Sequence, residues 1–144
     1  MRILDEYEMH AARGARVMPG AEELLRSLHQ RGLKLAVFTR NSRGAARAAI
    51  TALNLDGYLP LIVSRDDAPP KPDPRGLLLI ARQWQLPVSD LLYVGDYIYD
   101  LEAGERAGIE TWLYAPSTPD FEHRAKTIIQ SFDELAKTLM RQAD

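Results

Sequence analysis

The sequence has no cysteine among its 144 residues, which excludes disulfides, thiolate zinc sites and a cysteine nucleophile. Its three histidines are scattered, without the spacing of metal ligands. No apolar run approaches the roughly 20 residues that span a bilayer, and the N-terminus does not have the pattern of a signal peptide. With 18 basic and 20 acidic side chains, the net charge of −2 gives no reason to expect nucleic acid as a partner. We therefore expect a cytoplasmic protein that binds neither membrane nor nucleic acid.

Helix and strand signals alternate along most of the chain. Helices are predicted where apolar residues recur every three or four positions, and strands where short runs are almost wholly apolar. The predicted helices cover residues 19–32, 42–55, 75–86, 99–108 and 131–142. The predicted strands cover residues 33–39, 59–64, 90–95 and 109–115. This order predicts an α/β fold with a Rossmann-like parallel sheet and helices on both faces.

Polar residues follow the first predicted strand at its carboxyl end, where parallel sheets bind ligands. They are Thr39, Arg40 and Asn41. Hydroxyl and amide groups at the start of a helix suit an anion, because the helix dipole and its unpaired N–H groups both favour negative charge. These residues are candidates for phosphate binding. The simpler explanation, that Asn41 or Ser42 only caps the following helix, stays open at this point.

Three charged residues follow the later strands. Lys71 lies between two prolines, and its ammonium would neutralise a phosphoryl group, although a lone lysine in such a loop is usually solvated. Asp96 and Asp100 stand one helical turn apart and offer the oxygen ligands that Mg²⁺ prefers. Alternatively, Asp96 caps the helix and Asp100 faces solvent. Taken together and in this order, the residues at the strand ends predict phosphoryl chemistry.

The same residues resemble the haloacid dehalogenase superfamily, in particular its phosphoglycolate phosphatase-like members. "VFTRNS" resembles the second motif of that superfamily, "KPDP" the third and "VGDYIYD" the fourth. The resemblance covers about residues 17–140. It implies that Thr39 and Lys71 serve in catalysis and that Asp96 binds Mg²⁺ with Asp100 as its supporting acid. It also implies hydrolysis of a small phosphate ester through an aspartyl-phosphate.

The first motif of the superfamily, D-x-D-x-T at the end of the central strand, has no match in this sequence. Asp5 in "LDEYE" lacks the glycine and threonine at the right offsets, and "DEYEMHAA" is typical of a helix. We therefore expect residues 1–18 to be a remnant of a cap or linker helix and residues 19–144 to form the core. We expect the central strand to be absent, the chain to be truncated and inactive, and unpaired strand edges to favour self-association.

Three other interpretations are weighed. A degenerate phosphate- or protein-binding module would explain the missing motif. A carbon–halogen hydrolase of the same superfamily does not use Mg²⁺ and so does not explain the paired aspartates. A receiver-type signalling domain would carry its acids near an N-terminal strand and leaves "KPDP" unexplained. The sequence does not predict the substrate.

Overall fold

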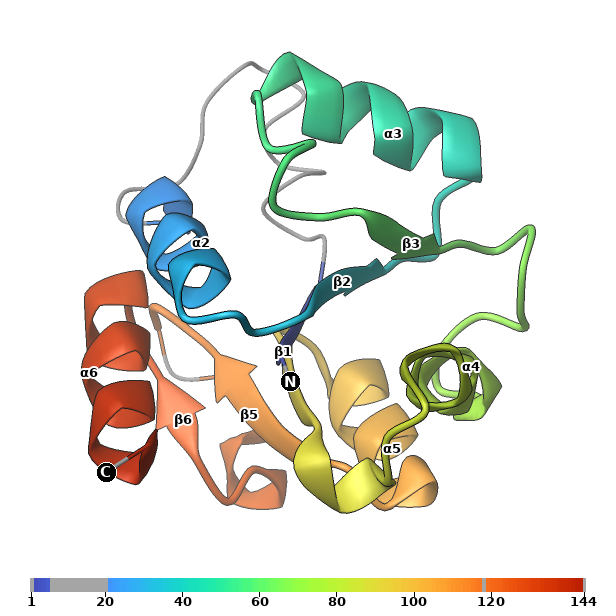
Figure 1. Ribbon diagram of the computed structural model, residues 1–144. Helices are drawn as coiled ribbons and strands as arrows, with labels where there is room; N and C mark the ends of the chain where they lie inside the picture. The colour runs from blue at the N-terminus through green and yellow to red at the C-terminus, as the bar shows by residue number, and fades with distance from the viewer. Residues whose placement is uncertain (1, 6–20, 118, 144) are drawn as a thin grey trace.

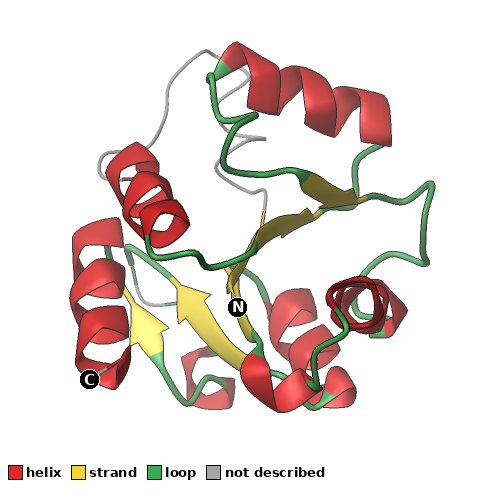
Figure 2. Ribbon diagram, in the orientation of Figure 1, coloured by secondary structure: helices red, strands yellow, loops and turns green. Residues whose placement is uncertain are grey.

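The computed structural model describes residues 2–5, 21–117 and 119–143 of the chain. They form one six-stranded sheet with the strand order β3-β2-β1-β4-β5-β6, and every neighbouring pair of strands is parallel (Figure 1). Helices cover both faces, as Figure 2 shows by secondary structure. The predicted α/β class with a Rossmann-like parallel sheet is confirmed.

The predicted elements are present, with bounds that are a few residues shorter or shifted by one residue. The strands are β1 Arg2–Asp5, β2 Leu35–Phe38, β3 Leu61–Val63, β4 Leu92–Gly95, β5 Glu110–Tyr114 and β6 Ile128–Ile129. The helices are α2 Ala21–Gln30, α3 Arg43–Ala52, α4 Arg75–Trp84, α5 Ile98–Ala107 and α6 Phe132–Ala143, with short 3₁₀ turns at Val88–Asp90 and Glu122–Arg124. The sequence pattern did not predict β1 or the two-residue β6.

Strand β1 corrects the expectation that the central strand is absent. Its residues pair with β2 on one side, Asp5 opposite Phe38, and with β4 on the other, Leu4 opposite Val94. Residues 2–5 therefore belong to the core sheet and not to a cap remnant, while residues 6–18 lie outside the described residues. Because β2 and β4 both pair with β1, the unpaired inner edges that were the reason to expect self-association do not exist here.

Two apolar layers hold the helices to the sheet. On one face, α2, α3 and α6 pack on the sheet through buried residues such as Leu25, Ile50 and Leu135. On the other face, α4 and α5 pack through residues such as Leu77 and Ala103. Strands β2 and β4 are short and buried along their whole length, which explains why their sequences are almost continuously apolar. Among the described residues no helix is long and apolar enough to cross a membrane.

Local signals in the sequence fix several helix ends. Gly32, two residues after α2, adopts the left-handed backbone conformation that stops a helix, with φ of 78°. Ser42 caps α3, accepting a hydrogen bond from the Ala45 N–H at 3.2 Å. The Glu134 N–H likewise donates to Ser131 Oγ at 3.0 Å at the start of α6, which is one contact of a capping box.

Candidate active site

Asp100 is the centre of the candidate site. Its Oδ1 lies 2.8 Å from Lys71 Nζ and accepts a 2.5 Å hydrogen bond from the Tyr93 hydroxyl. Its Oδ2 accepts hydrogen bonds from the backbone N–H groups of Asp96 and Tyr97, at 3.0 and 3.1 Å. A carboxylate offers about four lone-pair positions, and four donors fill them. Asp100 is therefore held firmly in place, and it does not face solvent.

Lys71 is buried, against the usual behaviour of a lysine in a proline-rich loop. Its side chain is 5% exposed, and its ammonium lies 5.4 Å from the centre of the Phe38 ring in addition to its pairing with Asp100. The peptide bond between Lys71 and Pro72 is cis. An ammonium group so far from water is retained only with a charged partner, so the loop brings Lys71 specifically to Asp100 in the first turn of α5.

Asp96 is half-buried at the carboxyl end of β4, and its pKa is raised from the ordinary value of 3.8 to about 7. Burial of the carboxyl group is the largest cause, followed by the negative charge of Asp100, while the charge of Lys71 acts in the opposite direction. A divalent cation beside Asp96 would favour its ionised carboxylate against the effects that raise its pKa, so the donor chemistry fits Mg²⁺. Because four donors occupy the lone pairs of Asp100, Asp96 is the one of the two carboxyl groups that could bind a metal ion directly.

Within residues 21–117 and 119–139, no group of three aspartate, glutamate or histidine side chains is placed to hold a metal.

Gly95 makes room for Asp100. A Cβ atom built on Gly95 would lie 2.5 Å from Asp100 Cγ and 2.7 Å from its Oδ2, closer than atoms can approach without displacement. The glycine before Asp96 therefore lets the start of α5 fold back over the end of β4. Sequence reasoning did not assign a role to Gly95 or Tyr93, although the alternation of side chains along β4 could have placed Tyr93 inward.

Thr39 directly follows β2 and is completely buried. Its Oγ1 accepts a 2.9 Å hydrogen bond from the Asn41 N–H, and its own N–H donates to Val63 O at 3.0 Å. The Asn41 carbonyl accepts from Arg65 N at 3.2 Å. Arg40 points outward, and its guanidinium lies 5.5 Å from the centre of the Tyr99 ring.

Strand β1 lies between the strands that lead to Thr39 and to Asp96, so its last residue occupies the middle of this edge. The backbone of Asp5 is level with Phe38, the residue before Thr39. The structure thus places Thr39, Lys71, Asp96 and Asp100 around the carboxyl edge of the sheet. Their roles in binding phosphate and metal stay predictions.

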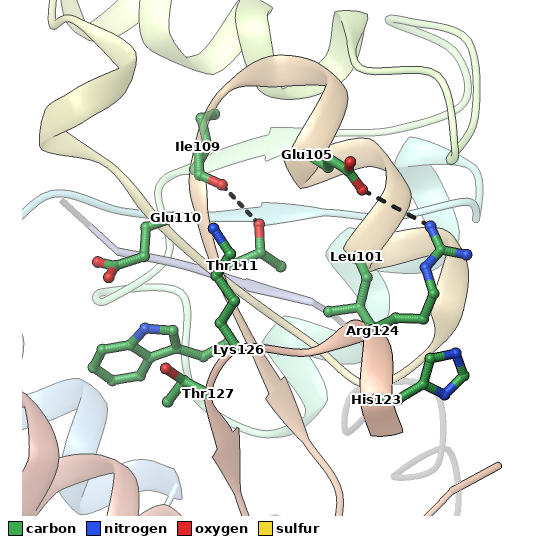
Figure 3. Close-up of a pocket in the computed structure, with 10 residues that line it drawn as sticks. Leu101, Glu105, Ile109, Glu110, Thr111, His123, Arg124, Lys126 and Thr127 are labelled. Atoms are coloured by element: carbon green, nitrogen blue, oxygen red, sulfur yellow. Dashed lines mark hydrogen bonds and ion pairs between the residues drawn. The ribbon is translucent and has the colours of Figure 1, made fainter. Parts of the chain in front are cut away.

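A cavity of about 510 Å³ lies elsewhere, beside the start of β5, and Figure 3 shows its lining. Glu105 and Arg124 form an ion pair of 3.8 Å at its wall, and Trp112 also lines it. The indole N–H of Trp112 has no hydrogen-bond partner among the described residues. None of the predicted site residues lines this cavity, so it is separate from the candidate site.

A parallel sheet with helices on both faces is a Rossmann-like α/β fold. In this protein Asp96, Asp100 and the buried Lys71 lie at the carboxyl edge of that sheet. The chain belongs to the haloacid dehalogenase-like hydrolase family, whose model matches residues 1–114. This confirms the resemblance drawn from the three motifs.

Curated relatives and solved structures agree with this membership. The chain is 35% identical over 109 residues to the phosphoglycolate phosphatase of Rhodospirillum rubrum, covering 75% of this chain and 45% of the relative. It is 33% identical over 110 residues to the N-acetylmuramic acid 6-phosphate phosphatase of Pseudomonas aeruginosa, covering 76% and 49%. A solved HAD-hydrolase of Bacillus subtilis, YfnB bound to magnesium, has the same fold, with a TM-score of 0.79, 21% identity, and 93% and 60% coverage. The chain spans 35%, 62% and 45% of the first three curated relatives.

Proposed function

We propose that this chain carries the phosphate- and magnesium-binding part of a phosphomonoester hydrolase site that acts on a small phosphorylated metabolite. The observation that carries the proposal is the buried pair of Lys71 and Asp100, 2.8 Å apart, beside a carboxyl group at Asp96 whose pKa is raised. Two relatives named as phosphatases of phosphoglycolate and of a sugar phosphate support this class of substrate.

Each residue has a separate part in the proposed site. Thr39 and Asn41 bind phosphoryl oxygens, and Lys71 neutralises their charge. Asp96 holds Mg²⁺, and Asp100 fixes the positions of Lys71 and of the backbone around Asp96. When bound, Mg²⁺ supplies positive charge to the phosphoryl group. A fold neighbour that is bound to magnesium is consistent with this choice of metal.

Hydrolysis through an aspartyl-phosphate also needs an aspartate nucleophile and an acid/base. The D-x-D-x-T pattern occurs nowhere in the 144 residues, and the sequence has Tyr7 two positions after Asp5. We therefore propose that this chain by itself binds phosphate esters and does not hydrolyse them at a useful rate. The absence of the motif also favours a second candidate, a non-catalytic phosphate- or protein-binding module on the same fold.

Calorimetry with inorganic phosphate and Mg²⁺ tests the binding part of the proposal. We expect phosphate to bind more tightly with Mg²⁺ than without it, and Lys71→Ala to abolish the binding. The exposed Lys34 gives the matched control, because Lys34→Ala removes one positive charge at the opposite end of β2. Binding that survives Lys71→Ala, or that ignores Mg²⁺, would contradict the proposed site.

Hydrolysis of a panel of phosphate monoesters tests whether the chain has catalytic activity by itself. We expect release of phosphate at the rate of the buffer alone. Asp5 gives the sharpest control, since it ends the central strand. Mg²⁺-dependent hydrolysis that Asp5→Asn abolishes would show that the chain is a complete enzyme with Asp5 as its nucleophile.

A further inference from the structure

Three aromatic rings and one arginine form a continuous surface at the start of α5, which we call the aromatic surface. The ring of Tyr97 packs edge-to-face against Tyr99 at 5.2 Å and against Phe121 at 5.5 Å. The guanidinium of Arg40 lies 5.5 Å from the centre of the Tyr99 ring. Contacts of these two kinds are favourable, so the four side chains hold one another in place, and Phe121 also packs against the small core of Leu101, Leu113 and Ala115.

The aromatic surface is exposed to an unusual degree. Tyr97 is 51% exposed and Tyr99 is 38% exposed. Among the described residues, Leu78 is the only other large hydrophobic side chain with an exposed fraction as high as 38%. Scattered exposed apolar side chains need no explanation, but rings gathered in one place mark a binding surface. The helix α5 does not need these rings for packing, because it is attached to the sheet by Leu101, Ala103 and Ala107.

The surface begins directly beside the candidate site. Arg40 follows Thr39 in the chain, and Tyr97 follows Asp96. The aromatic surface therefore adjoins the residues proposed to bind phosphate and metal, and it is where the alcohol part of a bound phosphate ester would lie. Among the described residues no carboxylate pairs with Arg40, and one face of its guanidinium is directed to Tyr99. Its N–H edges suit a carboxylate, which arginine binds with two parallel hydrogen bonds.

We propose that the aromatic surface selects phosphate monoesters whose alcohol part contains a ring that carries a carboxylate. The ring packs against Tyr97 and Tyr99, and the carboxylate pairs with Arg40. This inference rests on the proposed function, because the phosphoryl group of the ligand occupies the site of Thr39, Lys71 and Asp96. It adds a substrate class, and it assigns Arg40 to the carboxylate of the ligand in place of the phosphoryl group that the sequence suggested for it.

Four phosphonates that cannot be hydrolysed test the two contacts separately in the whole chain with Mg²⁺. Methylphosphonate has neither ring nor carboxylate, phosphonoacetate has the carboxylate, benzylphosphonate has the ring, and para-carboxybenzylphosphonate has both. By calorimetry we expect the ring to lower Kd about tenfold and the carboxylate on the ring to lower it about tenfold again.

Variants assign each gain to its side chain. Tyr99→Leu is expected to remove the gain from the ring, and Arg40→Gln to remove only the gain from the carboxylate. Arg82→Gln, which removes an exposed arginine on α4, is the matched control and should change nothing. All of these positions are partly or fully exposed, and thermal unfolding curves confirm that each variant is folded.

The outcomes separate this inference from the proposed function. Equal affinity for all four phosphonates, with Lys71→Ala abolishing binding, would overturn the aromatic surface and leave the phosphate site intact. A gain from the ring that persists in both Tyr97→Leu and Tyr99→Leu would also overturn it. If neither inorganic phosphate nor any phosphonate binds, the proposed function is wrong. The inference about the alcohol part of the phosphate ester is then wrong as well.

Discussion

Lys71 Nζ lies 2.8 Å from Asp100 Oδ1, and the two side chains are only 5% and 3% exposed. A pair at this depth is unlike a surface ion pair, because neither charge can turn to water when the other is removed. One contact therefore serves two purposes: it orients the groups of the proposed site, and it joins the loop before α4 to the start of α5.

Replacing Lys71 is expected to affect stability as well as binding. Lys71→Ala leaves the Asp100 carboxylate buried without its cation, and breaking such a pair costs about 3–5 kcal/mol. Urea unfolding measures the loss. The double variant Lys71→Met with Asp100→Asn removes both charges and should recover part of it. A change below about 0.5 kcal/mol in Lys71→Ala would show that the pair is not buried in solution.

Asp96 should make the stability of the metal-free chain fall as the pH rises. Its pKa is raised from 3.8 to about 7, so the folded state favours the protonated form. The stabilisation from Asp96 is therefore complete below its ordinary pKa and is lost as the pH rises through about 7. Unfolding measured from pH 4 to pH 8 should show this loss in the parent chain and a smaller one in Asp96→Asn. Identical pH profiles for the two would contradict the raised pKa.

Magnesium should reverse that loss at pH above 7, because it binds the ionised carboxylate of the folded state and not the unfolded chain. We expect the melting temperature at pH 8 to rise with Mg²⁺ in the parent chain. Asp96→Asn should show no such rise, while Asp90→Asn, an exposed aspartate before β4, should behave as the parent. A rise of equal size in Asp96→Asn would place the metal elsewhere.

Adding a single methyl group at Gly95 should disturb the site. In Gly95→Ala the new Cβ would lie 2.5 Å from Asp100 Cγ, so either Asp100 or the end of β4 must move. Overpacking of this kind costs about 1–3 kcal/mol, and phosphate binding should weaken with it. Gly44 in α3 is the control, because nothing lies within 4 Å of its added Cβ. There alanine should stabilise the chain by about 0.5–1 kcal/mol.

Thr39 should contribute to phosphate binding through its hydroxyl group alone. Thr39→Val keeps the volume of this buried side chain but removes the acceptor of the Asn41 N–H, so the turn before α3 loses its anchor. We expect phosphate affinity to fall about tenfold, and Thr39→Ser to restore most of it. An unchanged phosphate affinity in Thr39→Val would show that Thr39 contributes only to packing.

The sequence predicted four of the six strands and the polar residues that follow two of them, because these features depend on local sequence patterns. Apolar runs marked β2 to β5, and polar residues directly after two of them marked Thr39 and Asp96. Strand β1 was missed because four residues carry little signal, and its position depends on pairing with residues 35–38 and 92–94, far along the chain. No local pattern contains such long-range information.

The burial of Lys71 and the role of Tyr93 were missed for a related reason. Prolines around Lys71 predict a loop but not where the loop leads. Tyr93 reads as one more apolar strand residue, and only the fold shows that its hydroxyl reaches Asp100. The different surroundings of Asp96 and Asp100 also depend on hydrogen bonds that the spacing of the two residues does not specify.

The position of β1 has a consequence for the order of folding. The pairs β2–β3 and β4–β5 join strands that are neighbours along the chain, so each can form as a local unit. Strand β1 alone joins the two units, through partners that are distant in sequence, and contacts of that kind form slowly because long loops must close first. The strand end that carries Thr39 and the strand end that carries Asp96 are therefore brought together only when β1 is inserted between β2 and β4. In hydrogen exchange, the amide protons of β1 should become protected last during refolding, at the same time as phosphate binding appears.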